Sequence, residues 1–120
     1  MASELVVFRN RKESAEVDAP WSGEVVSGNP HTKTWNLFTS SDNKIFAGIW
    51  EGTPGVWRFS YDDWEYCHLL SGRCTVTLDG ELPVEMNPGD VFILEPGAKG
   101  LWTVNETMRK YYVFVSGGSQ

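Results

Sequence analysis

Two stretches decide the fold of this chain: residues 55–65, GVWRFSYDDWE, and residues 89–97, GDVFILEPG. Each combines a run of aromatic and β-branched residues with a turn signal, which is Asp62-Asp63 in the first stretch and Pro96-Gly97 in the second. Aromatic and β-branched residues favour strands, whereas Asp, Pro and Gly favour the tight turns between them. The two stretches therefore predict short strands joined by short connections.

Almost all of the chain after residue 33 repeats this pattern, and no stretch keeps a helical period. Regularly spaced short strands separated by turn residues are typical of an all-β sandwich or barrel. The expected strands are 34–38, 44–50, 55–61, 64–71, 73–78, 82–86, 91–94, 101–104 and 109–115. A length of 120 residues suits one domain. Within it we expect an N-terminal arm and edge strand at 1–33, a barrel at 34–115 and a frayed tail at 116–120.

Charge and hydropathy exclude several partners. The net charge of −6 disfavours a nucleic-acid partner and an anionic membrane surface. No apolar run is long enough to span a membrane, and the N-terminal residues lack the basic start and apolar block of a secretory signal. We expect a cytoplasmic protein. Its two cysteines, Cys67 and Cys74, are expected to be reduced core residues, because two thiols make neither a disulfide framework nor a metal site.

Four motifs resemble those of small cupins of the domain-of-unknown-function 861 group (DUF861, or Cupin_3). They are residues 48–55, GIWEGTPG, residues 64–72, WEYCHLLSG, residues 88–92, PGDVF, and residues 102–112, WTVNETMRKYY. This group is similar to the cupin domains of (S)-ureidoglycine aminohydrolase. The resemblance implies a double-stranded β-helix, or jelly roll, with a pocket inside one end of the barrel.

The same resemblance shows where a metal-using cupin would hold its metal. The ligand positions fall at Phe59, Tyr61, Glu65 and Gly100, with Arg58 and Ser60 as the other allowed spacing of the first two. One carboxylate with these neighbours cannot supply the three or four ligands that zinc, manganese or iron needs. The two histidines, His31 and His68, lie elsewhere in the sequence. We therefore expect no metal and no cofactor.

Glu65 is the main candidate for a functional residue. A carboxylate in an apolar barrel is costly unless it is paired or protonated, and Tyr61, Arg58 and Lys110 are possible partners. Two interpretations are open. Glu65 either has a structural role, capping the hairpin at 71–72 or pairing with a lysine, or forms with Lys110 or Tyr61 the polar end of a ligand pocket. In the second interpretation Glu65 and Lys110 are the candidate catalytic residues.

Aromatic residues are the candidates for the wall of this pocket, since ligand sites combine apolar rings with a few polar groups. The candidates are Trp57, Phe59, Tyr61, Phe92, Trp102 and Tyr112. Plain core packing is the alternative for each ring. Because strand side chains alternate between faces, an inward Glu65 places Tyr66 and His68 on the outer face. A row of exposed aromatic residues there predicts a homodimer, because monomers rarely leave such a surface uncovered.

Three functions from different classes agree with these features. The first is a metal-free cupin that binds a small polar organic molecule, such as a ureide, an amino-acid derivative or a sugar derivative. The second is an enzyme similar to ureidoglycine aminohydrolase, which acts on a carbon–nitrogen bond with Glu65 as acid/base or metal ligand. The third is a non-catalytic dimeric interaction module.

Overall fold

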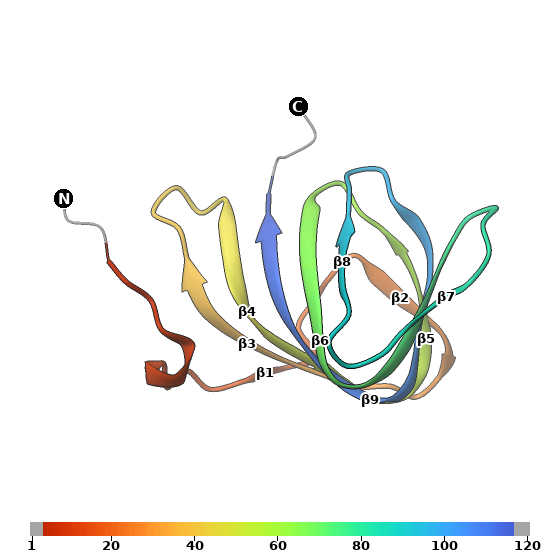
Figure 1. Cartoon of the computed structure of the whole chain (residues 1–120), viewed down its shortest axis with the longest axis horizontal. Coiled ribbons are helices and arrows are strands. Elements are labelled where there is room, and N and C mark those ends of the chain that lie inside the picture. Colours follow the sequence, from red (N-terminus) through yellow and green to blue (C-terminus); the bar gives the residue numbers. More distant parts are fainter. Residues whose placement is uncertain (1–3, 117–120) are drawn as a thin grey trace.

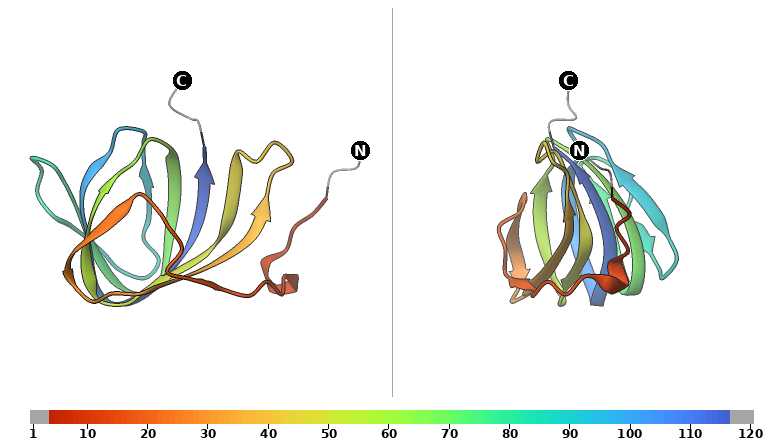
Figure 2. Two further views of the ribbon diagram at one scale, coloured as in Figure 1. Left: turned by 180° about the vertical axis from the view of Figure 1, so that it is seen from behind. Right: turned by 90° about the vertical axis from the view of Figure 1, so that its left-hand side faces the viewer.

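The computed structural model describes residues 4–116, in which nine strands form one curled antiparallel sheet (Figures 1 and 2). A 3-10 helix, η1 (Phe8–Asn10), precedes the first strand. The strands are β1 (Glu16–Val17), β2 (Gly23–Gly28), β3 (Thr32–Thr39), β4 (Ile45–Gly52), β5 (Gly55–Ser60), β6 (Trp64–Leu78), β7 (Val84–Met86), β8 (Val91–Leu94) and β9 (Lys99–Val115). Residues 1–3 and 117–120, which include most of the expected tail, lie outside the described residues.

Two long strands, β6 and β9, connect the two walls of the barrel. One wall contains β4, β3 and β1, and the other contains β5 and β2. They pair from Trp64↔Val115 to Leu78↔Gly100, while β9 also pairs with β5 near its start and with β4 near its end. The sequence predicted two separate strands in each of these regions, and this detail was wrong. The hydrogen-bonded ladder continues through these regions because the residues between the predicted strands form β-bulges instead of turns.

Gly72 allows β6 to bulge against β9. Its φ is +79°, and a Cβ at this position would lie 2.1 Å from the carbonyl oxygen of Thr107. Only glycine combines this backbone conformation with so close an approach of another strand. The turn signal read at Ser71-Gly72 is therefore a bulge inside one long strand.

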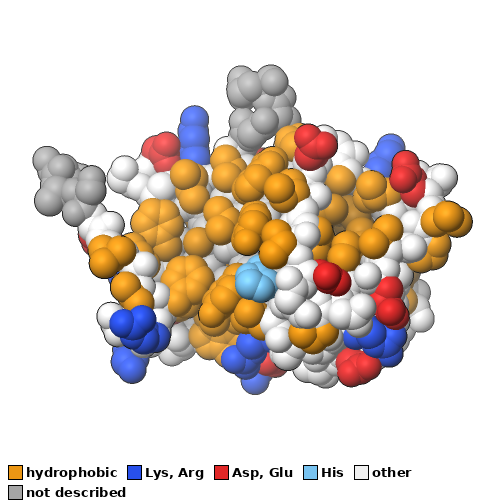
Figure 3. All heavy atoms as spheres, in the orientation of Figure 1, with side chains coloured by type: hydrophobic (Ala, Val, Ile, Leu, Met, Phe, Trp, Pro, Cys, Tyr) orange, Lys and Arg blue, Asp and Glu red, His pale blue; other side chains and the backbone are white. Residues whose placement is uncertain are grey.

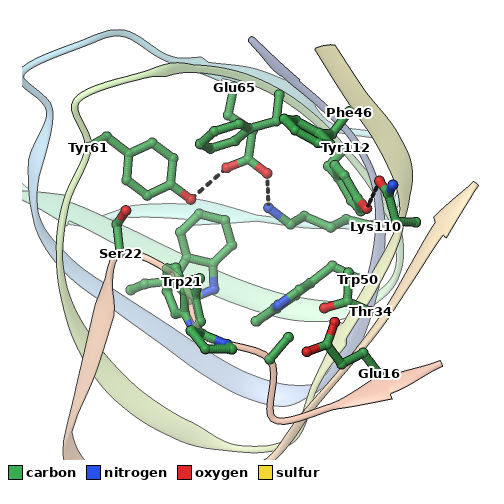
Figure 4. A pocket seen from close by; sticks show the side chains of 15 residues that line it. Glu16, Trp21, Ser22, Thr34, Phe46, Trp50, Tyr61, Glu65, Lys110 and Tyr112 are labelled. Carbon is green, nitrogen blue, oxygen red and sulfur yellow. Dashed lines mark hydrogen bonds and ion pairs between the residues drawn. The ribbon is translucent and has the colours of Figure 1, made fainter. Parts of the chain in front are cut away.

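The N-terminal part of the chain connects the two edges of the sheet. The strand order β1-β3-β4-β9-β5-β2 places β1 at one edge and β2 at the other. Residues 18–22, called the crossing segment below, run from β1 to β2 and so pass from one wall of the barrel to the other (Figure 4). The amide of Asp18 donates to the carbonyl of Thr32, and the amide of Ser60 donates to the carbonyl of Ser22, so both walls hold this segment.

The core lies between the walls and is rich in aromatic residues. Trp21, Trp50, Trp57 and Trp102 form edge-to-face contacts with ring centroids 5.7–6.5 Å apart. Rings of this size bury large apolar areas and favour such offset geometry. The two free cysteines are buried in the same core, as expected.

The burial pattern of β6 confirms the predicted strand faces. Glu65, Cys67 and Leu69 are buried, whereas Tyr66 and His68 on the opposite face are partly exposed. The predicted all-β class and jelly-roll barrel are confirmed as well. In the described part of the chain, no helix is long and apolar enough to cross a membrane.

Candidate functional site

A cavity of about 470 Å³ opens between the walls at the mouth of the barrel (Figure 4). It is lined by strands β1, β3, β4, β6 and β9, by the crossing segment, and by Tyr61 in the turn between β5 and β6. Its lining residues are Glu16, Ala19, Pro20, Trp21, Ser22, Thr34, Asn36, Phe46, Trp50, Tyr61, Glu65, Trp102, Lys110, Tyr112 and Phe114. The volume lies in the range of small-molecule sites.

A buried ion pair lies in the wall of this cavity. Nζ of Lys110 donates to Oε2 of Glu65 at 2.8 Å, and the two residues are only 3% and 5% exposed. Glu65 lies on β6 and Lys110 on the neighbouring β9, where Lys110 is opposite Leu69 in the ladder. Both side chains therefore point inward from adjacent strands, as the alternation of faces requires.

Lys110 is surrounded by groups that stabilise its charge. Its ammonium lies 4.6 Å from the ring centroid of Trp102 and 5.3 Å from that of Trp50, within the range of cation–π attraction. Burial opposes the charge, but the pKa of Lys110 is raised because the neighbouring Cys67 and Glu65 outweigh the cost of desolvation. Lys110 is therefore a buried cation at neutral pH.

Two tyrosines extend this polar group. The hydroxyl of Tyr61 donates to Oε1 of Glu65 at 2.5 Å, and the hydroxyl of Tyr112 donates to Oδ1 of Asn36 at 2.8 Å. Burial and the negative charge of Glu65 raise the pKa of both phenols. Both tyrosines are therefore neutral at pH 7, and each has committed its single proton to a protein acceptor.

Cys67 lies behind the ion pair rather than in the cavity lining. Its Sγ is 3.3 Å from Nζ of Lys110, and burial raises the pKa of its thiol. A buried thiol with a raised pKa is a poor nucleophile. Cys67 therefore packs against Lys110 and accepts a weak hydrogen bond from it.

The structure brings together five of the residues that the sequence analysis selected. Glu65 and Lys110 form the ion pair, and Tyr61, Trp102 and Tyr112 line the same cavity. Trp57, Phe59 and Phe92 differ from the expectation, because they pack into the hydrophobic core outside the lining of this cavity. Their side chains point inward as predicted, but they lie in the part of the barrel interior that is filled by core side chains.

Several lining residues were missed by the sequence analysis. Trp21 reaches the cavity from the crossing segment, and Trp50 and Phe46 reach it from β4. Period-2 alternation along 45–52 could have assigned Trp50 and Phe46 to the inner face. Trp21 offers no such signal, since its position depends on strand pairings far away in the sequence.

The donor set does not fit the metal that many cupins hold. Among residues 4–116, no group of three or more His, Cys, Asp or Glu side chains is placed to hold a metal ion. Beside Glu65 lies the ammonium of Lys110, which cannot act as a ligand and already pairs with this carboxylate. At position 100, where the resemblance implied a fourth ligand, a Cβ would lie 2.0 Å from the carbonyl oxygen of Thr77. No side chain of a ligand fits there.

Comparison with known families identifies the fold. A family model described as the EutQ-like cupin domain matches residues 39–112, more than half of the chain. The chain belongs to the EutQ-like cupin family. No curated protein matches this EutQ-like cupin.

Solved structures agree with this family. The EutQ-like cupin is similar to the EutQ protein of Clostridium difficile, with 20% identity, a TM-score of 0.65, and coverage of 74% of this chain and 71% of that one. A DUF861 family protein of Thermotoga maritima has 31% identity and a TM-score of 0.51, with coverage of 53% of this chain and 73% of that one. The predicted resemblance to DUF861 cupins is thereby confirmed.

A protein of the DUF861 family from Pseudomonas syringae is longer than this chain. It has 23% identity and a TM-score of 0.70, with coverage of 89% of this chain and 46% of that one. The EutQ-like cupin therefore spans about half of that protein. Likeness at this level of identity extends to the fold alone.

Proposed function

We propose that this cupin binds a small polar organic molecule in the barrel cavity, beside Glu65 and Lys110 and without a bound metal. The observation that carries the proposal is a buried, hydrogen-bonded ion pair in the wall of a cavity of about 470 Å³. A mostly apolar cavity with a few convergent polar groups is the usual form of a small-molecule site. A cytoplasmic location, expected from the sequence, stays a prediction.

The position of the ion pair supports a functional role over a structural one. A buried ion pair contributes little net stability, because removing two charges from water costs about as much as their attraction returns. Apolar residues in place of Glu65 and Lys110 could therefore fill the same space at little cost in stability. Titratable groups that are buried beside a cavity are candidates for ligand contact, and Glu65 and Lys110 both line this one.

Tryptophan fluorescence provides a direct test, because Trp21, Trp50 and Trp102 line the cavity. We expect some members of a library of ureides, amino-acid derivatives and sugar derivatives to shift the emission and raise the melting temperature. Trp50→Phe should reduce the spectral change, whereas Trp64→Phe, on the outer face, should leave it intact. Absence of any shift across the library would refute binding. Stoichiometric manganese, zinc or iron in the purified protein would refute the metal-free part.

A second candidate is an enzyme that acts on a carbon–nitrogen bond with Glu65 as acid/base. It is favoured by the placement of Glu65 between two proton-bearing groups, the Tyr61 hydroxyl and the Lys110 ammonium, in the cavity wall. Release of ammonia from ureido compounds and amides would reveal the activity. Glu65→Gln should abolish it while the far-ultraviolet circular dichroism stays unchanged. Undiminished turnover in this variant would remove Glu65 from the chemistry.

The outer face of the barrel supports the homodimer expected from the sequence. Apolar side chains gather over β4, β9, β6 and β8 (Figure 3), where Val91 and Ile93 are 52% and 50% exposed. Tyr66 and Tyr111 belong to the same face. A second copy fits this surface, because a mostly apolar face, whose Arg109 is paired with Glu51, lets two chains of net charge −6 approach with little repulsion at the contact.

Sedimentation velocity tests the dimer. Tyr66→Glu places a charge in the centre of the apolar face and should convert the dimer to a monomer. Val25→Glu makes the same charge change at an exposed valine on the edge strand β2 and should have no effect. A wild-type protein that sediments as a monomer would refute the dimer.

A further inference from the structure

We infer that the ligand of this cavity is a small organic cation: a protonated amine on an apolar body, rather than a carboxylic acid or another anion. The inference rests on the proposed function and narrows its ligand class. Three properties of the cavity carry it: the hydrogen-bond groups that remain free, the charge of the lining, and the aromatic walls.

The charged donor and both phenols in the cavity wall are already committed to protein acceptors. Tyr61 donates to Glu65, Tyr112 donates to Asn36, and the amide nitrogen of Asn36 donates to Thr39 at 2.8 Å. The Lys110 ammonium donates to Glu65 and Cys67. The buried indole Nε1 of Trp102 has no hydrogen-bond partner among the described residues. An incoming acceptor, such as a ligand carboxylate, therefore finds a neutral donor but no cation that lacks a counter-ion.

Acceptors remain available in the same wall. Each carboxylate oxygen of Glu65 has accepted one hydrogen bond and can accept a second, and the two phenol oxygens keep lone pairs. Glu16 lies at the mouth, opposite Thr34 in the ladder between β1 and β3 (Figure 4). Its carboxylate is exposed and adds two more acceptor atoms. A ligand that donates several hydrogen bonds, as an ammonium group does, matches this set.

The charge of the lining also favours a cation over an anion. Of the described residues that line the cavity, Glu16 and Glu65 are acidic and Lys110 is the one basic residue. Lys110 and Glu65 neutralise each other at 2.8 Å, so the charge of Glu16 remains. An anion that recruited Lys110 would leave Glu65 buried without its counter-ion, which is strongly unfavourable. A cation needs no such rearrangement.

Aromatic rings form the apolar part of the wall. Trp21, Trp50, Phe46 and Phe114 all line the cavity. Their ring faces carry negative electrostatic potential and attract cations, as Trp50 and Trp102 already do with the Lys110 ammonium. The same rings offer an apolar surface to the body of the ligand. The cavity thus provides a negative, electron-rich lining around an apolar space.

Three probes of the same size and different charge test the inference: benzylammonium, benzyl alcohol and benzoate. Isothermal titration at pH 7 should show benzylammonium binding about tenfold tighter than benzyl alcohol, the equivalent of one favourable cation contact, and benzoate binding most weakly. Glu16→Gln should weaken benzylammonium binding about twofold to fivefold and leave benzyl alcohol unchanged. Glu24→Gln makes the same charge change on β2, outside the cavity lining, and should leave all three affinities unchanged.

The outcomes separate this inference from the proposed function. Tighter binding of benzoate than of benzylammonium, or equal binding of all three probes, refutes the charge preference and leaves the binding site in place. Binding of none of the probes and of no member of the polar library refutes the proposed function, and the inference with it. An effect of Glu24→Gln equal to that of Glu16→Gln would show that the net charge of the protein, and not the cavity, selects cations.

Discussion

Replacing Glu65 by Gln removes one charge of the buried pair and keeps the size of the side chain. The variant leaves the Lys110 ammonium in the core with an amide oxygen in place of a carboxylate. At 2.8 Å and an effective dielectric constant of about 20, the lost attraction is about 6 kcal/mol. Lys110 is only 3% exposed, so water does not replace the missing counter-ion. The variant is therefore expected to be much less stable than the wild type.

Deprotonation of Lys110 sets an upper limit to this loss. Keeping a lysine of ordinary pKa, near 10.4, neutral at pH 7 costs about 5 kcal/mol, which the variant can accept in place of a buried unpaired charge. The expected decrease in the free energy of unfolding is therefore about 3–5 kcal/mol at pH 7. Folded wild-type domains of this size have only about 6–18 kcal/mol available.

The pH dependence of stability gives a sharper test than the decrease itself. If Lys110 is neutral in the folded variant, the unfolded chain binds one more proton, and stability rises by about 1.4 kcal/mol per pH unit up to about pH 10. In the wild type the pKa of Lys110 is raised. Its contribution is then fully present below the ordinary lysine pKa and is lost as the pH rises above it. The two proteins should therefore converge in stability between pH 7 and 10.

Urea unfolding, followed by tryptophan fluorescence at several pH values, measures both effects. The double variant Glu65→Gln, Lys110→Met serves as the control, because it removes the stranded ammonium and keeps an acceptor for Tyr61. Its stability should recover by about 2–3 kcal/mol relative to Glu65→Gln alone. A loss below about 1 kcal/mol for Glu65→Gln at pH 7, without pH dependence, would refute the argument that the pair is buried and charged.

Three further perturbations follow from single contacts. Tyr61→Phe removes a hydrogen bond to a carboxylate and should lower the free energy of unfolding in urea by about 1–2 kcal/mol; an unchanged midpoint would contradict that bond. Gly72→Ala should cost about 2 kcal/mol or more, because a Cβ there meets a backbone oxygen at 2.1 Å, whereas Gly80→Ala, with φ of +78° and open space, should cost only about 1 kcal/mol. Equal losses of stability in the two variants would mean that the positive φ alone, and not the close contact, sets the cost. Cys67 and Cys74 should react with a thiol reagent only after unfolding, since burial raises both pKa values, that of Cys74 to about 11; fast labelling of the native protein would contradict their burial.

The sequence was sufficient to locate the ion pair because local rules act on it. Alternation along 64–70 placed Glu65 on the inner face, and the high cost of an unpaired buried carboxylate required a partner such as Lys110 or Tyr61. Both proposed partners bond to it in the structure. Arg58, the third candidate, instead pairs with Asp79 at 3.3 Å on the exposed side of β5.

The shape of the cavity could not be predicted in the same way. Alternation indicates which side chains point inward, but not which part of the interior is filled. Phe59 and Phe92 point inward and pack into the core, whereas Trp21 and Trp50 border the open part. That difference depends on how the crossing segment runs between two edge strands, and this path is set by pairings between residues far apart in the sequence.

The stability of the barrel and the outline of its cavity depend on different parts of the chain. The ion pair belongs to β6 and β9, which hold the barrel together, while Ala19, Pro20 and Trp21 reach the cavity from a short connection between the sheet edges. Exchange of Ala19 or Pro20 would alter the outline of the cavity without changing a strand of either wall, whereas Trp21 also packs on the tryptophans of the core. The connection is thus a natural place to redesign this protein, since libraries built there would vary its selectivity on a constant scaffold.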